Sequence, residues 1–228
     1  MNTNRKTAII IGILFIIGTV AGLLSIVSII EKPDYLTKVS ENANQIFLGA
    51  FFQLVMVPAY IGIALLLYPI LRKHNERLSL GFVGFRFIAG AFHIIGVISL
   101  PLFLILSQEF VKAGAPDLSH FQTLGTLLRA GRDLLNHVGM IISLSIGGLM
   151  LYRILYQSKL IPRWLSSWGL IGSTLTILAS LLLMIRLIDV VTPIYLVMNA
   201  PMAVQEIVLA LWLIIKGFNP AIVDSNTK

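Results

Sequence analysis

Long apolar runs, separated by short polar segments, dominate the hydropathy pattern of the chain. These runs cover residues 8–30, 46–71, 78–106, 122–155, 165–185 and 194–215. Runs of about 18 or more mostly apolar residues are typical of helices that cross a bilayer, whose hydrocarbon core is about 30 Å thick. The pattern therefore predicts an all-α integral membrane bundle of six helices, in a single transmembrane domain over residues 1–228.

The fourth run is too long for a simple crossing. A helix over residues 119–155 would extend about 55 Å at a rise of about 1.5 Å per residue. We therefore expect its first turns to stand outside the membrane, or the helix to bend near Gly131.

The composition supports a membrane protein and changes how the net charge is interpreted. Hydrophobic residues make up 57% of the chain, charged residues only 12%, and the mean hydropathy is +0.91, whereas soluble proteins carry about 25% charged residues. The lack of cysteine excludes disulfides, thiolate metal sites and cysteine nucleophiles. Because the basic residues flank apolar runs, we interpret the net charge of +7 as membrane orientation. The expected partner is lipid and not nucleic acid.

Lysine and arginine are distributed unevenly between the two sides that six crossings create. One side carries Arg5, Lys6, Arg72, Lys73, Arg77, Arg153, Lys159, Arg163, Lys216 and Lys228. The other side carries Lys32, Lys38, Lys112 and Arg186. Since basic residues in short loops favour the cytoplasmic side, both termini are predicted to lie in the cytoplasm. Aromatic residues near the same helix ends predict an interfacial belt of Tyr68, Tyr152, Tyr156, Trp164 and Trp168.

Small residues and a weak repetition each leave two interpretations open. Gly18 and Gly22 form a GxxxG motif, which favours close helix packing within the chain or, as the alternative, a homo-oligomer interface. The second, fourth and sixth runs end in similar aromatic and aliphatic residues. This similarity could mark a pseudo-repeat of helical hairpins, but any inner helix end favours such residues.

Ionisable side chains within the runs are the main candidates for function, because charge inside lipid is costly. Counting helical rise from the cytoplasmic ends places Arg86 at a depth of about 12 Å and Glu206 at about 15 Å. Opposite charges at one depth should meet, either as a structural pair or as part of a functional site. His93 and His137 lie at about 23 and 24 Å, and each could be a packing histidine, a ligand or a proton relay.

Further polar residues lie toward the outer end of the fourth run. Spacing of i, i+3, i+4, i+7 and i+8 places on one helix face Arg129, Arg132, Asp133, Asn136 and His137. Gln53, at a depth of about 28 Å, extends this group onto the second helix. For Arg132 and Asp133 alone, an interfacial ion pair is a sufficient explanation.

Together these residues predict a polar cavity that opens outward and admits a small polar or anionic molecule or a lipid head group. The candidate ligand-binding residues are Gln53, Arg86, His93, Arg132, Asp133, Asn136, His137 and Glu206. This hypothesis of a binding or transport protein requires no cofactor and no metal ion.

Two other functions remain open, so the sequence does not decide whether the protein is an enzyme. A membrane-embedded enzyme acting on lipid could use His93, His137, Asp133 or Glu206 as acid, base or metal ligand. A haem bridging His93 and His137 is compatible with their matching depths. The sequence lacks the His-Glu-x-x-His, Gly-x-Ser-x-Gly and phosphate-loop signatures. The third hypothesis is a noncatalytic sensor or partner subunit.

Five stretches of the sequence resemble a bacterial membrane family known as domain-of-unknown-function family 4386. They are PDYL at residues 33–36, LYPILRKHNE at 67–76, GFVGFR at 81–86, IPRWLSSWGLIG at 161–172 and QEIVLALW at 205–212. The resemblance covers nearly the whole chain and implies a multi-pass protein of the bacterial cytoplasmic membrane. It implies no reaction and no catalytic residues.

Overall fold

The computed structural model describes residues 3–114, 118–190 and 192–225, and among these residues it contains helices and turns but no strand. The elements, in chain order, are α1 (Thr3–Leu24), η1 (Ser28–Glu31), α2 (Tyr35–Glu41), α3 (Ala43–Leu71), α4 (Glu76–Lys112), α5 (Leu118–Asp133), η2 (Leu134–Met140), α6 (Ile141–Ser158), α7 (Arg163–Met184), α8 (Pro193–Ile215) and α9 (Pro220–Ser225). In this part of the chain, six helices are long and apolar enough to cross a membrane. The α5, η2 and α6 segments form one of them, as a continuous run over Ser119–Ser158. The predicted all-α fold is confirmed.

The first crossing ends earlier than its apolar run. The helix α1 stops at Leu24, and the Ser25 hydroxyl donates a hydrogen bond of 2.8 Å to the carbonyl oxygen of Gly22. Farther along, Ile29 and Ile30 belong to the 3₁₀ turn η1 and are buried against other residues of the protein. The prediction that the first span continues to residue 30 was wrong, because these apolar side chains pack inside the protein.

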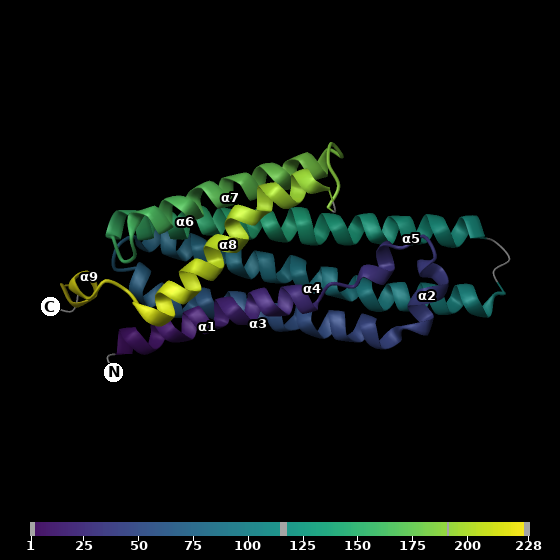
Figure 1. Ribbon diagram of the computed structural model, residues 1–228, viewed down its shortest axis with the longest axis horizontal. Helices are drawn as coiled ribbons and strands as arrows, with labels where there is room; N and C mark the ends of the chain where they lie inside the picture. Colours follow the sequence, from purple (N-terminus) through teal and green to yellow (C-terminus); the bar gives the residue numbers. More distant parts are fainter. Residues whose placement is uncertain (1–2, 115–117, 191, 226–228) are drawn as a thin grey trace.

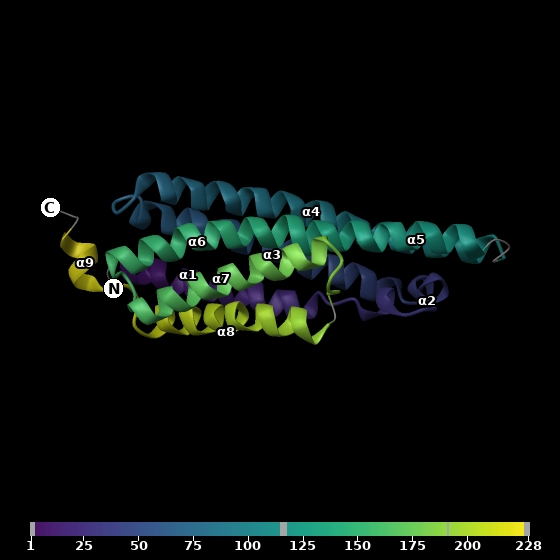
Figure 2. The same cartoon turned by 90° about the horizontal axis from the view of Figure 1, so that it is seen from above.

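The six spanning helices form a closed ring. Each packs against its predecessor in the chain, and α1 packs against α8 to complete the circle (Figures 1 and 2). In this order α4 stands opposite α8, and α3 stands opposite α7. Side chains on α4 and α8 therefore face one another only across the centre of the ring.

The helices differ in length, so one end of the ring extends into a cap. The cap consists of η1, α2, α5 and the end of α4. The helices α1 and α7 have 22 residues and α8 has 23, which corresponds to about 33 Å and matches a bilayer core. The helix α4 has 37 residues, and it extends with α5 beyond the ends of α1, α7 and α8 to pack with α2 (Figure 1). The first turns of the fourth crossing thus stand beyond the ring, while α5 continues through Gly131.

Arg129 of α5 ties the cap together. Its guanidinium donates a hydrogen bond to the carbonyl oxygen of Ile30, lies 3.7 Å from the Glu31 carboxylate and sits 4.9 Å from the centre of the Tyr35 ring. The sequence pattern predicted a group of Arg129 with Gln53, but the contacts of Arg129 place it in the cap.

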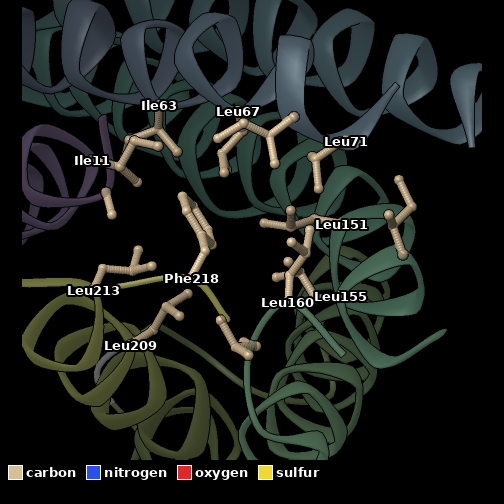
Figure 3. Close-up of a cluster of buried hydrophobic side chains, with 14 of the residues drawn as sticks. Ile11, Ile63, Leu67, Leu71, Leu151, Leu155, Leu160, Leu209, Leu213 and Phe218 are labelled. Carbon is tan, nitrogen blue, oxygen red and sulfur yellow. The ribbon is translucent and has the colours of Figure 1, made fainter. Parts of the chain in front are cut away.

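The end of the ring that carries both termini is closed by apolar side chains (Figures 1 and 3). We call this end the basic end, because it also carries the larger set of lysine and arginine residues. Side chains from α1, α3, α6 and α8, from the turn after α6 and from the chain after α8 converge there, as Figure 3 shows for Ile11, Ile63, Leu67, Leu71, Leu151, Leu155, Leu160, Leu209, Leu213 and Phe218. This apolar plug separates the ring interior from the basic end.

The GxxxG motif of α1 faces the neighbouring helix of the same chain. Gly18 lies against the Tyr60 ring and Gly22 against the Met56 side chain, both on α3. The motif therefore serves packing within the chain, as one of its two interpretations predicted. A homo-oligomer and a pseudo-repeat of hairpins stay predictions.

Arg5 joins the two ends of the chain at the basic end. Its guanidinium donates hydrogen bonds to the carbonyl oxygens of Leu213 at 2.8 Å, Ile214 at 2.5 Å and Ile215 at 3.0 Å. These are carbonyls in the last turn of α8, which have no partner within their own helix.

Replacing Arg5 by methionine keeps the aliphatic stem and removes these hydrogen bonds. We expect the free energy of unfolding to fall by about 2 kcal/mol, which corresponds to a fall of about 4–8 °C in Tm in detergent. The matched control is Lys6→Met, because Lys6 is exposed and its loss removes the same charge. Equal Tm values for the two variants would show that the capping bonds contribute nothing to stability.

Candidate functional site

The polar residues inside the ring form two layers. The inner polar layer comprises Tyr60, Arg86, Tyr152, Gln205 and Glu206. The outer polar layer comprises Gln53, His93, Arg132, Asp133, Asn136, His137 and Tyr195. Arg86 and His93 are seven residues apart on α4, so the layers are separated by about 10 Å along the helix axis.

Arg86 is the cation of the inner polar layer. Only 2% of its surface is exposed, and its guanidinium lies over the rings of Tyr60 at 5.7 Å and Phe82 at 5.2 Å. Its Nε atom is buried without a hydrogen-bond partner among the described residues. Aromatic faces attract a guanidinium but do not replace the hydrogen bonds that water would supply.

Glu206 faces Arg86 from the opposite side of the ring. Its carboxylate is partly buried and is close enough to interact electrostatically with Arg86. The hydroxyls of Tyr60 and Tyr152 are close enough to interact with both charges. In the described part of the chain no salt bridge joins Arg86 to Glu206. The expected direct contact is therefore not formed, because α4 and α8 are not neighbours in the ring.

Tyr152 was predicted to be an interfacial aromatic residue, and this prediction was wrong. Its side chain is completely buried, and its hydroxyl donates a hydrogen bond of 2.8 Å to Oε1 of Gln205. The Gln205 Nε2 atom in turn donates to the carbonyl oxygen of Leu165 at 3.2 Å. Gly169 makes room for the ring, because a Cβ atom there would lie 2.5 Å from it. The sequence signal for a buried Tyr152 was Gly169 on the next helix, because a glycine there leaves space for an aromatic ring.

In the outer polar layer, one ring nitrogen of His93 is hydrogen-bonded, and the other has no partner among the described residues. Its Nε2 atom lies 3.1 Å from the backbone carbonyl oxygen of Gln53. Since a carbonyl only accepts, Nε2 carries the hydrogen and donates it. The buried Nδ1 atom has no partner among the described residues, and neither has Oε1 of Gln53. Both can accept a hydrogen bond.

A π-helical segment, η2, turns Asn136 and His137 toward different helices. The Asn136 carboxamide lies against the backbone of α4 at Gly96, where a Cβ atom would clash with its Oδ1. The Nδ1 atom of His137 lies 2.8 Å from the hydroxyl of Tyr195 on α8. A π turn contains an extra residue and so shifts the helical register. The predicted single face of the fourth helix is therefore divided between two neighbours.

Arg132 and Asp133 complete the outer polar layer. The Arg132 Nη1 atom lies 3.9 Å from Oδ1 of Asp133, and both side chains are largely shielded from solvent. The Arg132 charge acts on both His93 and His137, and Asp133 acts on Tyr195. Tyr195, which the sequence pattern did not indicate, joins this layer through its contact with His137.

Residues 10–217 match the family model described as Domain of unknown function (DUF4386). The chain belongs to this family. Comparison with the curated proteins and with the solved structures gave no match. The DUF4386 match includes every residue of both polar layers, whereas Arg5 and Phe218 lie outside it.

The arrangement within this DUF4386 chain bears on the histidine hypotheses. His93 and His137 each already engage a protein group through one ring nitrogen. Among the residues described, no group of three or more histidine, aspartate or glutamate side chains could hold a metal ion. A haem between the two histidines stays a prediction.

Proposed function

We propose that this polytopic membrane protein binds a small polar or anionic molecule, or a lipid head group, inside its helical ring and serves in its transport. The observation that carries the proposal is the opposition of Arg86 and Glu206 across the ring without direct contact. Two charges held apart in a low-dielectric interior attract a molecule that can interact with both.

The unpaired polar atoms support this proposal. In the described part of the chain, Nε of Arg86, Oε1 of Gln53, Nδ1 of His93 and Oδ1 of Asn136 are buried without a protein partner. Each unsatisfied buried group costs about 1–3 kcal/mol, so such atoms in a native protein call for a compensating partner. The Arg86 atom donates and the other three groups accept, which suits a guest with both kinds of polar group.

The form of the ring suggests a route. The plug that contains Leu67, Leu151 and Phe218 closes the basic end, and Tyr152 of the inner polar layer packs in the same cluster. A guest would therefore reach the outer polar layer first, move about 10 Å to the inner layer, and leave only when the plug opens. Alternating access would then require the plug to open after the guest has bound.

The proposal includes a location and an orientation. The excess of lysine and arginine at the basic end supports a cytoplasmic position for both termini. We place the protein in the bacterial cytoplasmic membrane, with the cap on the outer side.

A thermal-stability screen of the purified protein tests the proposal. The probes are inorganic phosphate, acetate, succinate and glutamate at millimolar concentration and constant ionic strength. A compound present at about 100 times its Kd stabilises by about 2.7 kcal/mol, which we expect to raise Tm by about 5–10 °C. The rise should disappear in Arg86→Gln and persist in Arg153→Gln, whose arginine is exposed. A rise that Arg86→Gln retains, or no rise with any probe, argues against the proposal.

A further inference from the structure

A pocket at the basic end lies apart from both polar layers. It has a volume of about 520 Å³ and lies between the turn that joins α6 to α7 and the chain that follows α8. It is lined by Lys159, Arg163 and Lys216 and also by Trp212 and Phe218. The pocket therefore combines cations with apolar surface.

Backbone geometry builds this pocket. Lys159 ends α6 in the left-handed region at φ 58°, and Gly217 turns the chain after α8 at φ 73°. The Asn219 amide then donates a hydrogen bond of 2.9 Å to the carbonyl oxygen of Leu160, which joins the two walls. Arg5 fixes the end of α8 beside them. The pocket is thus a feature of the fold and not a gap between loose segments.

Among the described residues, the cations of the pocket have no acidic partner. No described acidic side chain lines the pocket, and no salt bridge in this part of the chain involves Lys159, Arg163 or Lys216. Arg163 stacks over the Tyr156 ring at 5.1 Å, which orients its guanidinium but leaves the charge in place. Three cations around one hollow predict an anionic ligand.

The aromatic surroundings indicate where that ligand comes from. Trp164, which is 53% exposed, packs edge-on against Trp212 with ring centroids 6.5 Å apart. Exposed tryptophan at the end of spanning helices marks the head-group level of a bilayer. An anion held beside Trp212 therefore lies where phospholipid phosphates lie, and its acyl chains can follow the apolar outer surface.

We propose that this pocket binds the phosphate of an anionic phospholipid. Lys159, Arg163 and Lys216 hold the phosphate, while Trp212 and Phe218 contact the glycerol region. The occupant is a lipid of the surrounding leaflet and is distinct from the molecule bound in the polar layers.

Tryptophan fluorescence offers a direct test, because the three tryptophans of the chain are Trp164, Trp168 and Trp212. Trp212 lines the pocket, and Trp164 packs against it. The protein is reconstituted into phosphatidylcholine vesicles with increasing amounts of brominated phosphatidylglycerol, whose bromine quenches nearby tryptophan. Brominated phosphatidylcholine gives the reference. We expect the relative binding constant to favour phosphatidylglycerol by about tenfold or more over phosphatidylcholine.

Two triple variants separate a built site from general attraction. Lys159→Gln, Arg163→Gln, Lys216→Gln removes the pocket cations, and Arg72→Gln, Lys73→Gln, Arg77→Gln removes three exposed cations at the same end. The first should abolish the preference and the second should keep it. Equal loss in both, or no preference in the wild type, overturns the proposal.

Two further arms complete the experiment. Lys159→Gly removes one pocket charge and suits the left-handed backbone at that position, so it remains informative if the triple variant does not fold. It should lower the preference roughly fivefold, and an unchanged preference contradicts the assignment. Inorganic phosphate at constant ionic strength should leave the quenching unchanged. If phosphate removes it, the site binds a free anion and the lipid assignment is wrong.

Discussion

Replacing Arg86 by glutamine is expected to lower the stability of the folded protein by about 3 kcal/mol, because it leaves the Glu206 carboxylate inside the ring without its balancing charge. The corresponding fall in Tm is about 6–12 °C. Arg86 also loses its contacts with Tyr60 and Phe82 in this variant. Glu206→Gln should have a similar effect, since it leaves the arginine unbalanced.

The double variant distinguishes electrostatic coupling from loss of packing. Arg86→Gln together with Glu206→Gln removes both charges, so we expect Tm to recover most of the way toward the wild type. Thermal unfolding of the four proteins in one detergent gives the coupling free energy. If the decreases in unfolding free energy of the two single variants simply add in the double variant, the charges do not interact across the ring. The interpretation of the inner polar layer would then be wrong.

The same double variant separates a structural role from a functional one. A purely structural pair predicts that the stable double variant still responds to any probe that stabilises the wild type. The proposed binding role predicts that the response remains lost although Tm has recovered. Arg153→Gln again serves as the control, because it removes an exposed arginine from the same chain.

The number and type of the helices could be predicted from the sequence, because lipid imposes long apolar runs on any crossing segment. Their arrangement around the ring could not. On α3 the exposed residues include Phe47, Leu48 and Phe51, while Ile46 is buried. The outer and inner faces of such a helix carry the same residue types, so hydropathy contains little information about which face meets which neighbour.

In the candidate site, likewise, the sequence predicted the depth of a residue but not the helix that its side chain faces. Counting residues placed Arg86 and Glu206 at one level, and the structure has them in one layer, but depth does not tell whether two helices are adjacent or opposite. The π turn at η2 likewise sends Asn136 and His137 to different helices. Tyr152 was assigned to the interface because aromatic residues near helix ends often lie there, although its hydroxyl bonds Gln205 inside the protein.

Closure of the ring depends on close contact between α1 and α8, and Gly12 lies at a tight point of this contact. A Cβ atom on Gly12 would lie 2.7 Å from the backbone carbonyl oxygen of Ala210 and 2.7 Å from the Ile214 side chain. A side chain can rotate away from such a contact, but a helix backbone cannot. Gly12→Val should therefore push α8 away from α1, and overpacking of this kind costs about 1–3 kcal/mol or more.

Gly84→Val is the matched control, because a Cβ atom at Gly84 meets no atom within 4 Å. We expect Gly12→Val to lower Tm by about 6 °C or more and to reduce the monodisperse fraction in size-exclusion chromatography. Gly84→Val should match the wild type, since valine costs a helix no more than glycine does. Both layers need the closed ring to hold α8 opposite α4, so the Gly12 variant should also lose the stabilisation by anionic probes. Equal behaviour of the two valine variants would mean that the seam between α1 and α8 is not what keeps Glu206 facing Arg86.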